Sequence, residues 1–461
     1  WGSITVEDGG TLVIDNPAEK NAKLMLMGTA VVTLEPGAKM ISKSTLGVET
    51  ASAANLIISA QEGKMAQFLY HPSVNQGRHP QATVEYHSKA KKLTAWDRFG
   101  FPDYKGMCIN QIKFKGPQAA SLIYEWNNVI NDWKVISDHS KEIAPVTGLT
   151  LTNNSTDGGI IYQFPCEIVG NLNASLELEN GWNSFSNSYT ANADVEAYLK
   201  SIINNYFDDL SAALYIYKNG EESSDWDVIG LQDFKDGKYD AALAKLDPMQ
   251  AFLIKKTSKK TVMGSINYEE QVWNPANGIT TPATAPRQMM DMNKVIITLT
   301  DAQGKDVRLT IREAAEFSAE YDNGADIAMY ENANRFNFYA TTDFDNQCQI
   351  ATNDIEGQVL TLATKGETSF TMSFSDVRGE KMAIRDNMTG DVIEMAEGVT
   401  YNFIANANEV SERFTIIAAA QAPTAIQKAE AAVKAAKFIR HDQVILQNNG
   451  RLFNVLGAEV K

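Results

Sequence analysis

The sequence predicts an all-β chain that comprises the end of a parallel β-solenoid, tandem β-sandwich-like modules, a C-terminal β-sandwich and a short hairpin tail. Three observations predict this: strand-turn-strand phrases at the start, an aromatic-rich internal repeat in the middle, and short strands about ten residues apart after a proline-rich stretch. Since 461 residues exceed the size of one ordinary core, the chain is expected to be modular.

Residues 1–60 are predicted to form β-solenoid rungs. The stretches 4–14 and 30–41 each read as strand, tight turn, strand, with alternating apolar residues and a turn at Gly9-Gly10 or Pro36-Gly37. Rungs bury their apolar faces by stacking, and about three are needed, so we expect these residues to cap a longer solenoid upstream. Two ordinary hairpins are the alternative.

Residues 61–177 and 178–270 are predicted to be two copies of one β-module. A Trp-led strand, a Tyr-rich strand, a polar turn ending in Asp-Trp and a Pro-started apolar strand recur in the same order. The second copy carries two insertions with helical spacing, at 195–214 and 231–243. The matched positions are Trp96 with Trp182, Tyr124 with Tyr217, Trp133 with Trp226, and Pro145 with Pro248.

The four matched tryptophans have two interpretations. Equivalent places on predicted strands favour repeated core positions. Exposed rings would instead stack on sugar faces, which makes a glycan-binding unit the alternative.

The C-terminal part divides into three segments. Residues 271–291, with three prolines among small polar residues, are predicted to be a linker. Residues 292–418 hold regularly spaced strands and are predicted to form a β-sandwich, with a turn at 386–391. Residues 419–461 are predicted to be an Ala-rich tether followed by a hairpin, whose strands 437–446 and 451–456 flank Asn448-Asn449-Gly450.

Several of these phrases resemble modules of Bacteroidota surface proteins. Residues 181–187, 215–217 and 248–255 resemble a module frequent near their C-termini, and 385–390, 401–403 and 413–416 resemble the domain that usually follows it. The tail 453–461 is similar to endings of exported proteins in that phylum, some of which carry type IX C-terminal sorting domains, although it lacks their usual final Gly-x-Tyr strand. The resemblance implies a secreted or outer-surface, adhesin-like protein that contacts export machinery through its tail.

Composition narrows the partners. The net charge of −16 disfavours nucleic acid and anionic membranes, and no apolar run reaches the about 20 residues of a membrane span. The first residues show no signal-peptide pattern, so the chain is expected to be truncated or processed. The three widely spaced cysteines, Cys108, Cys166 and Cys348, predict buried free thiols rather than disulfides or a zinc cluster.

Few residues are candidates for metal binding or catalysis, and each of them also has a purely structural interpretation. The histidines are expected to lie on surface loops, with only His79 and His87 placed to face one another in a metal site. The complete set is His71, His79, His87, His139 and His441. Asp208-Asp209 and Asp343-Phe344-Asp345 could provide two glycosidase carboxylates, but acidic loops are common in this chain. Residues 322–326 could hold calcium, although an Asx-type turn is expected.

We therefore expect a non-catalytic, adhesin-like or structural protein without cofactor, metal or assigned catalytic residues, and with an unidentified ligand. Its expected partners are cell-surface glycans or other surface proteins, and its expected location is extracellular or on the outer cell surface. The alternatives are an accessory C-terminal part of a β-helix polysaccharide-degrading enzyme and a glycan-binding module.

Overall fold

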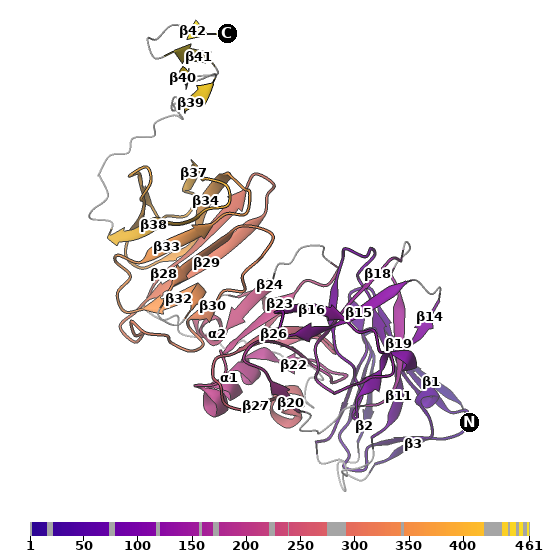
Figure 1. Ribbon diagram of the computed structural model, residues 1–461. Coiled ribbons are helices and arrows are strands. Elements are labelled where there is room, and N and C mark those ends of the chain that lie inside the picture. Colours follow the sequence, from indigo (N-terminus) through magenta and orange to yellow (C-terminus); the bar gives the residue numbers. More distant parts are fainter. Residues whose placement is uncertain are drawn as a thin grey trace.

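A computed structural model of the protein describes the ranges 2–15, 22–72, 79–116, 120–155, 159–168, 175–220, 226–237, 239–273, 292–342, 345–418, 436–440, 443–448, 451–454 and 459–460. The described residues are mainly strands, which confirms the all-β class. In Figure 1 the N-terminal strands lie next to the two predicted modules, and the strands of residues 292–418 lie beside them. The strands at the C-terminus lie farther away.

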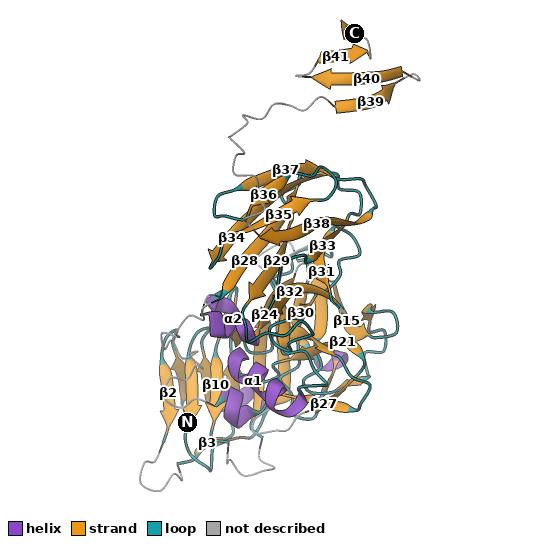
Figure 2. Ribbon diagram, turned by 90° about the vertical axis from the view of Figure 1, so that its left-hand side faces the viewer, coloured by secondary structure: helices purple, strands orange, loops and turns teal. Residues whose placement is uncertain are grey.

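The N-terminal strands stack in three parallel ladders, which we call the stacked coils (Figure 2). The first ladder contains β1 (Ser3–Val6), β4 (Val31–Leu34), β7 (Leu56–Ile58) and β11 (Gln81–His87). The second contains β2 (Thr11–Ile14), β5 (Lys39–Ser42) and β10 (Gln67–Tyr70), and the third β3 (Leu24–Leu26) and β6 (Val48–Thr50). Short elements between them are η1 (Ala53–Asn55), β8 (Ala60–Gln61) and β9 (Lys64–Met65).

The ladders do not stop at residue 60, where the sequence suggested a boundary. β10 and β11 extend the coils, and β19 (Ile161–Glu167) pairs antiparallel with β11, followed by β14 (Lys113–Lys115). One sheet therefore runs from the coils into the first module, and both share a core that includes Leu34, Phe68 and Phe164.

The two modules have the same topology. In each four-stranded sheet the strand order is first, fourth, second, third. The first sheet consists of β12 (Asp97–Phe99), β18 (Leu149–Asn153), β15 (Ser121–Asn127) and β16 (Asp132–Val135). The second consists of β21 (Gly181–Ser186), β26 (Ala251–Lys256), β23 (Ala213–Tyr217) and β24 (Trp226–Gly230).

Smaller pairs repeat as well. β13 (Met107–Cys108) with β17 (Glu142–Ile143) corresponds to β22 (Ala193–Asp194) with β25 (Lys245–Leu246). The outer pair β11 with β19 corresponds to β20 (Ser175–Leu178) with β27 (Val262–Ser265). η2 (Ile109–Gln111) lies in the first copy.

The strand register aligns the copies residue by residue and corrects one match. Trp96 aligns with Trp182, Trp133 with Trp226, and Pro145 with Pro248, as predicted. Tyr124 was matched wrongly to Tyr217: it pairs with Val135 and Thr150, whereas Tyr215 pairs with the equivalent Val228 and Leu253. The turn between the second and third strands is longer in the second copy, so counting back from the tryptophan shifted the match by two residues.

The modules contact one another reciprocally. The Gly100 amide donates to the Met249 carbonyl at 2.8 Å, and the equivalent Ser186 amide donates to the Val146 carbonyl at 2.9 Å. Val146 and Met249 each follow a proline and have φ of 59° and 62°. A positive φ at this turn position usually requires glycine, so both copies use an unfavourable backbone that aims a carbonyl at the other copy.

Both predicted insertions of the second module contain a helix, but the first helix is shorter than the predicted range 195–214, because Ala213 and Leu214 belong to β23. α1 (Val195–Tyr206) is capped at its N-terminus by Asp194, whose carboxylate accepts from the Ala197 amide. The second insertion forms α2 (Leu231–Asp236) and η3 (Ala241–Ala244), and η4 (Tyr268–Val272) closes the module. Apolar faces of these helices pack into the second module's core, which includes Leu199, Phe234 and Phe252.

The unit after the linker, which we call the sandwich unit, is one hydrogen-bonded path rather than two separate sheets. Its order is β36, β35, β38, β33, β31, β32, β29, β28, β34, β37, with β30 beside β32. Predicted strands are present, while β30, β32 and β36 were missed because they are short or polar. The bounds are β28 (Asn293–Asp301), β29 (Asp306–Glu313), β30 (Ile327–Ala328), β31 (Asn337–Thr341), β32 (Asn346–Thr352), β33 (Val359–Ala363), β34 (Ser369–Arg378), β35 (Met382–Asp386), β36 (Val392–Glu394), β37 (Thr400–Ile404) and β38 (Val410–Ala418).

The C-terminal strands form a separate four-stranded sheet. β40 (Gln443–Asn448) and β41 (Arg451–Asn454) pair antiparallel, as the hairpin prediction requires. The predicted single strand 437–446 is wrong, because β39 (Ala436–Arg440) pairs back onto β40. β42 (Glu459–Val460) completes the sheet. The predicted tether, most of the predicted linker and Asn449-Gly450 lie outside the described residues.

Candidate functional site

Aromatic side chains of both modules gather on one face of their four-stranded sheets. Each module has one ring pair joining its first and second strands and another joining its second and third strands. All four pairs meet edge to face, an arrangement that aromatic rings favour. With their centroid separations they are Trp96–Tyr124 (5.3 Å), Trp126–Trp133 (5.3 Å), Trp182–Tyr215 (4.7 Å) and Tyr217–Trp226 (5.4 Å).

Arg98 fills the space between the two sets of rings. Its guanidinium carbon lies 4.4 Å from the ring centroid of Tyr217 and 4.7 Å from that of Trp133. Its Nη1 donates to the Thr150 hydroxyl. Burial lowers the pKa of Arg98 to about 10, with an opposing effect from Tyr217, so the side chain stays charged at neutral pH. The guanidinium of Arg98 therefore already occupies the π faces of the aromatic rings that could otherwise bind the cation of a ligand.

The tryptophans are neither fully buried nor freely exposed. Partial burial is common to all four matched tryptophans, Trp96, Trp133, Trp182 and Trp226. They are therefore neither fully buried core residues nor an exposed platform for sugars. Neither ring-stacking on sugars nor any other ligand binding follows from the edge-to-face pairs alone.

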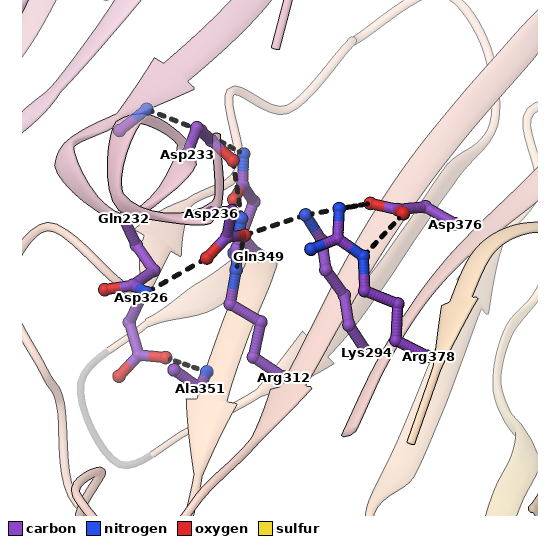
Figure 3. Close-up of polar contacts among 11 residues, drawn as sticks. Gln232, Asp233, Asp236, Lys294, Arg312, Asp326, Gln349, Ala351, Asp376 and Arg378 are labelled. Carbon is purple, nitrogen blue, oxygen red and sulfur yellow. Dashed lines mark hydrogen bonds and ion pairs between the residues drawn. The ribbon is translucent and has the colours of Figure 1, made fainter. Parts of the chain in front are cut away.

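A second polar cluster joins the second module to the sandwich unit (Figure 3). Arg312 on β29 points at α2, where its Nε donates to Asp236 at 2.8 Å and its Nη2 to Asp233. Lys294 on β28 contacts Asp236 at 2.7 Å and Asp376 at 3.1 Å. We call these residues, together with Gln349 and Arg378, the interface ion cluster.

The carboxylates and cations of this cluster stabilise one another's charge. Burial alone would raise the pKa of Asp236, but Arg312 and Lys294 outweigh it and hold that pKa below its usual value. Burial likewise opposes the charge of Arg312, and Asp233 and Asp236 reverse the effect and raise its pKa. The cluster therefore consists of ion pairs withdrawn from water that connect α2 of the second module to β28 and β29 of the sandwich unit.

The turn at residues 322–326 makes internal hydrogen bonds and connects units. The Asp326 carboxylate accepts from the backbone amides of Asp322 and Ala351, both at 2.6 Å. The Asn323 side chain reaches the second module, where it accepts from Ala212 and donates to the Phe207 and Leu210 carbonyls. The carboxyl and amide groups that could have bound calcium are thus used for backbone contacts. Burial raises the pKa of Asp326 to about 7.

The candidate histidines are not brought together. His79 stacks on Tyr104 with centroids 3.7 Å apart, and burial lowers its pKa. His87 lies on β11 rather than on a surface loop, and His71 meets Trp273 edge to face. No group of three or more potential metal-binding side chains occurs among the residues that the structure describes, which leave out His441.

Two of the four candidate carboxylates, Asp209 and Asp345, each meet a lysine. Asp209 lies 3.4 Å from Lys260, and hydrogen bonding from Ser258 lowers its pKa. Asp345 pairs with Lys255, while Asp343 lies outside the described residues. A glycosidase acid needs a raised pKa, whereas the pKa of Asp209 is lowered.

The cysteines differ in burial. All three are free, but only Cys166 is buried; Cys108 and Cys348 are partly exposed, so the expectation of three buried thiols is wrong for those two.

The phrases that carried the sandwich resemblance converge in space. Arg413 donates to Asp386 at 2.7 Å, with both side chains almost fully buried. The Tyr401 hydroxyl bonds to Asp386 at 2.9 Å and Asp391 at 3.0 Å, which links β37 to the turn between β35 and β36. These residues bring the two ends of the strand path together, so their role in the fold is structural.

Sequence reasoning missed both polar centres. The sequence did contain a signal for each: Arg98 directly follows the Trp96-Asp97 phrase, and the cations Lys294 and Arg312 interrupt otherwise apolar strands.

Comparison with protein-family models, curated proteins and solved structures finds no match. In the described part of the chain, no helix has the length and apolar character needed to cross a membrane.

Proposed function

We propose that the chain is a non-catalytic, adhesin-like or structural protein of the bacterial cell surface. The observation that carries this proposal is the coupling of its units. Stacked coils and first module share a sheet, the modules exchange backbone hydrogen bonds, and buried ions join the second module to the sandwich unit. A rigid β-body of this kind suits a protein that presents binding surfaces at a distance.

The proposed location rests on the resemblance to Bacteroidota surface proteins in residues 181–187 and 385–390. It is tested with an antibody against this chain on intact and permeabilised cells of the source. Labelling of intact cells supports the surface location. Labelling that requires permeabilisation refutes it, and an antibody to a cytoplasmic protein provides the control for cell integrity.

A further inference from the structure

The duplicated modules provide an internal comparison of two equivalent surfaces. The shared register makes Leu122, Tyr124 and Val135 of the first module equivalent to Ala213, Tyr215 and Val228 of the second. Because side chains alternate along strands, each set lies on the face that carries the aromatic pairs. We call this the ring face of each module.

The ring face of the second module is covered by the sandwich unit. Ile327 is fully buried there, and the Tyr215 hydroxyl donates to the Ala328 carbonyl. The Tyr330 ring lies 5.1 Å from Trp182 and 5.7 Å from Trp226. A short segment that begins in β30, with an aliphatic and an aromatic side chain three positions apart, thus occupies this face.

Among the described residues, none covers the ring face of the first module in this way. Leu122 is 43% exposed and Val135 42%, whereas Ala213, at the place of Leu122, is 0% exposed. Tyr124 is partly exposed while Tyr215 is fully buried. The same ring geometry therefore exists in both modules, but only the second has its occupant within the described chain.

The uncovered face continues an established interface. Trp126 and Trp133 of the first module belong to the same apolar cluster as Ile327 and Tyr330. At the tip of the β15–β16 hairpin, the Asn128 side chain donates to the Trp182 carbonyl at 2.8 Å. The aromatic surface of the first module therefore adjoins the covered ring face of the second.

The chemistry of this face favours a polypeptide over a sugar. Thr150 and Thr152 are its polar residues on the central strand, and both are buried, with the Thr152 hydroxyl donating to the Lys92 carbonyl. Sugar sites need hydrogen-bonding groups beside the stacking ring, because sugar hydroxyls lose water on binding.

We propose that the ring face of the first module, formed by Trp96, Leu122, Tyr124 and Val135, binds a short segment of another polypeptide. That segment presents an aliphatic and an aromatic side chain three positions apart, as Ile327 and Tyr330 do for the second module. The inference rests on the proposed adhesin-like function, since it names a partner surface for it. The two can fail separately, because cell labelling tests location and a binding assay tests this face.

The test uses the full chain and a fluorescent peptide with the sequence of residues 324–331. We expect saturable binding by fluorescence anisotropy, and a loss of affinity of at least about tenfold in the chain carrying Leu122→Glu and Val135→Glu. Val410→Glu, at an apolar position that is 70% exposed on β38, is the matched control and should bind as the unaltered chain does. A peptide with serine in place of its isoleucine and tyrosine should not bind.

Three results would overturn the proposal. The first is no saturable binding up to about 1 mM peptide. The second is equal binding by the Leu122→Glu and Val135→Glu chain, which would indicate displacement of the resident segment on the second module. The third is a glycan, found on an array, whose binding is lost in that same chain while the peptide does not bind. Circular dichroism checks that the variants fold, which is expected because both replaced side chains are exposed.

Discussion

Replacing Arg312 by methionine tests whether the interface ion cluster fixes the second module to the sandwich unit. The cluster balances three carboxylates, Asp233, Asp236 and Asp376, against three cations, Lys294, Arg312 and Arg378. Arg312→Met leaves one negative charge unbalanced where Asp236 is fully withdrawn from water. Removing one partner of such a buried pair costs about 3 to 5 kcal/mol, so the free energy of unfolding should fall by that amount.

The assay is urea denaturation of the full chain, followed by circular dichroism and tryptophan fluorescence. Arg308→Met is the control on the same strand: Arg308 is 70% exposed and pairs with Asp306 at 3.4 Å, so its loss should cost about 0 to 1 kcal/mol. The pair of Arg312→Met with Asp236→Asn should cost less than the sum of the two single changes, by at least about 1 kcal/mol. A cost for Arg312→Met no larger than that for Arg308→Met would refute the reasoning.

Three further changes test other contacts. The carboxyl group of Asp326 has a pKa of about 7 in the folded protein and about 3.9 in the unfolded chain. Between these pH values only the folded protein therefore keeps the proton. Stability should therefore fall as pH rises from about 4 to 7, and Asp326→Asn should flatten that part of the Tm profile; an unchanged slope contradicts the assignment. A Cβ on Gly148 would lie 2.7 Å from the Phe185 nitrogen, which is too close for unstrained packing. Gly148→Ala should therefore lower the stability of the paired modules in thermal unfolding by about 1 to 3 kcal/mol. No change in stability would mean that the modules separate easily. Tyr401→Phe removes the hydroxyl shared by Asp386 and Asp391 and should cost about 1 to 3 kcal/mol in urea denaturation, which an unaltered midpoint would exclude.

Local patterns predicted the elements well where one face of a strand is buried. Alternation located strands such as Asn293–Asp301 and Val359–Ala363, and three- and four-residue spacing located α1. The same patterns missed β32, where Asn346, Gln347 and Gln349 are polar yet belong to a central strand. Their side chains are held by hydrogen bonds to distant groups, such as Asp233 for Gln349, which no local window contains.

At the candidate sites, too, local patterns identified some residues and missed those that depend on distant contacts. Sequence reasoning selected Trp96, Trp133, Trp182 and Trp226, and the structure brings all four to the ring faces. It could not select Arg98 as their common neighbour, because the second module has Ser184 at that position and the guanidinium inserts between copies.

By itself, the sequence determined the all-β class, the duplication and most strand positions, because these follow from periodicity and from phrases that recur within one chain. Only the tertiary structure decided that the coils continue past residue 60, that Tyr124 matches Tyr215, and that one ring face is covered while its equivalent is open. These features depend on pairing and packing between residues more than one hundred positions apart, such as Tyr215 and Ala328, and local patterns carry no information about which distant surface will cover a given face.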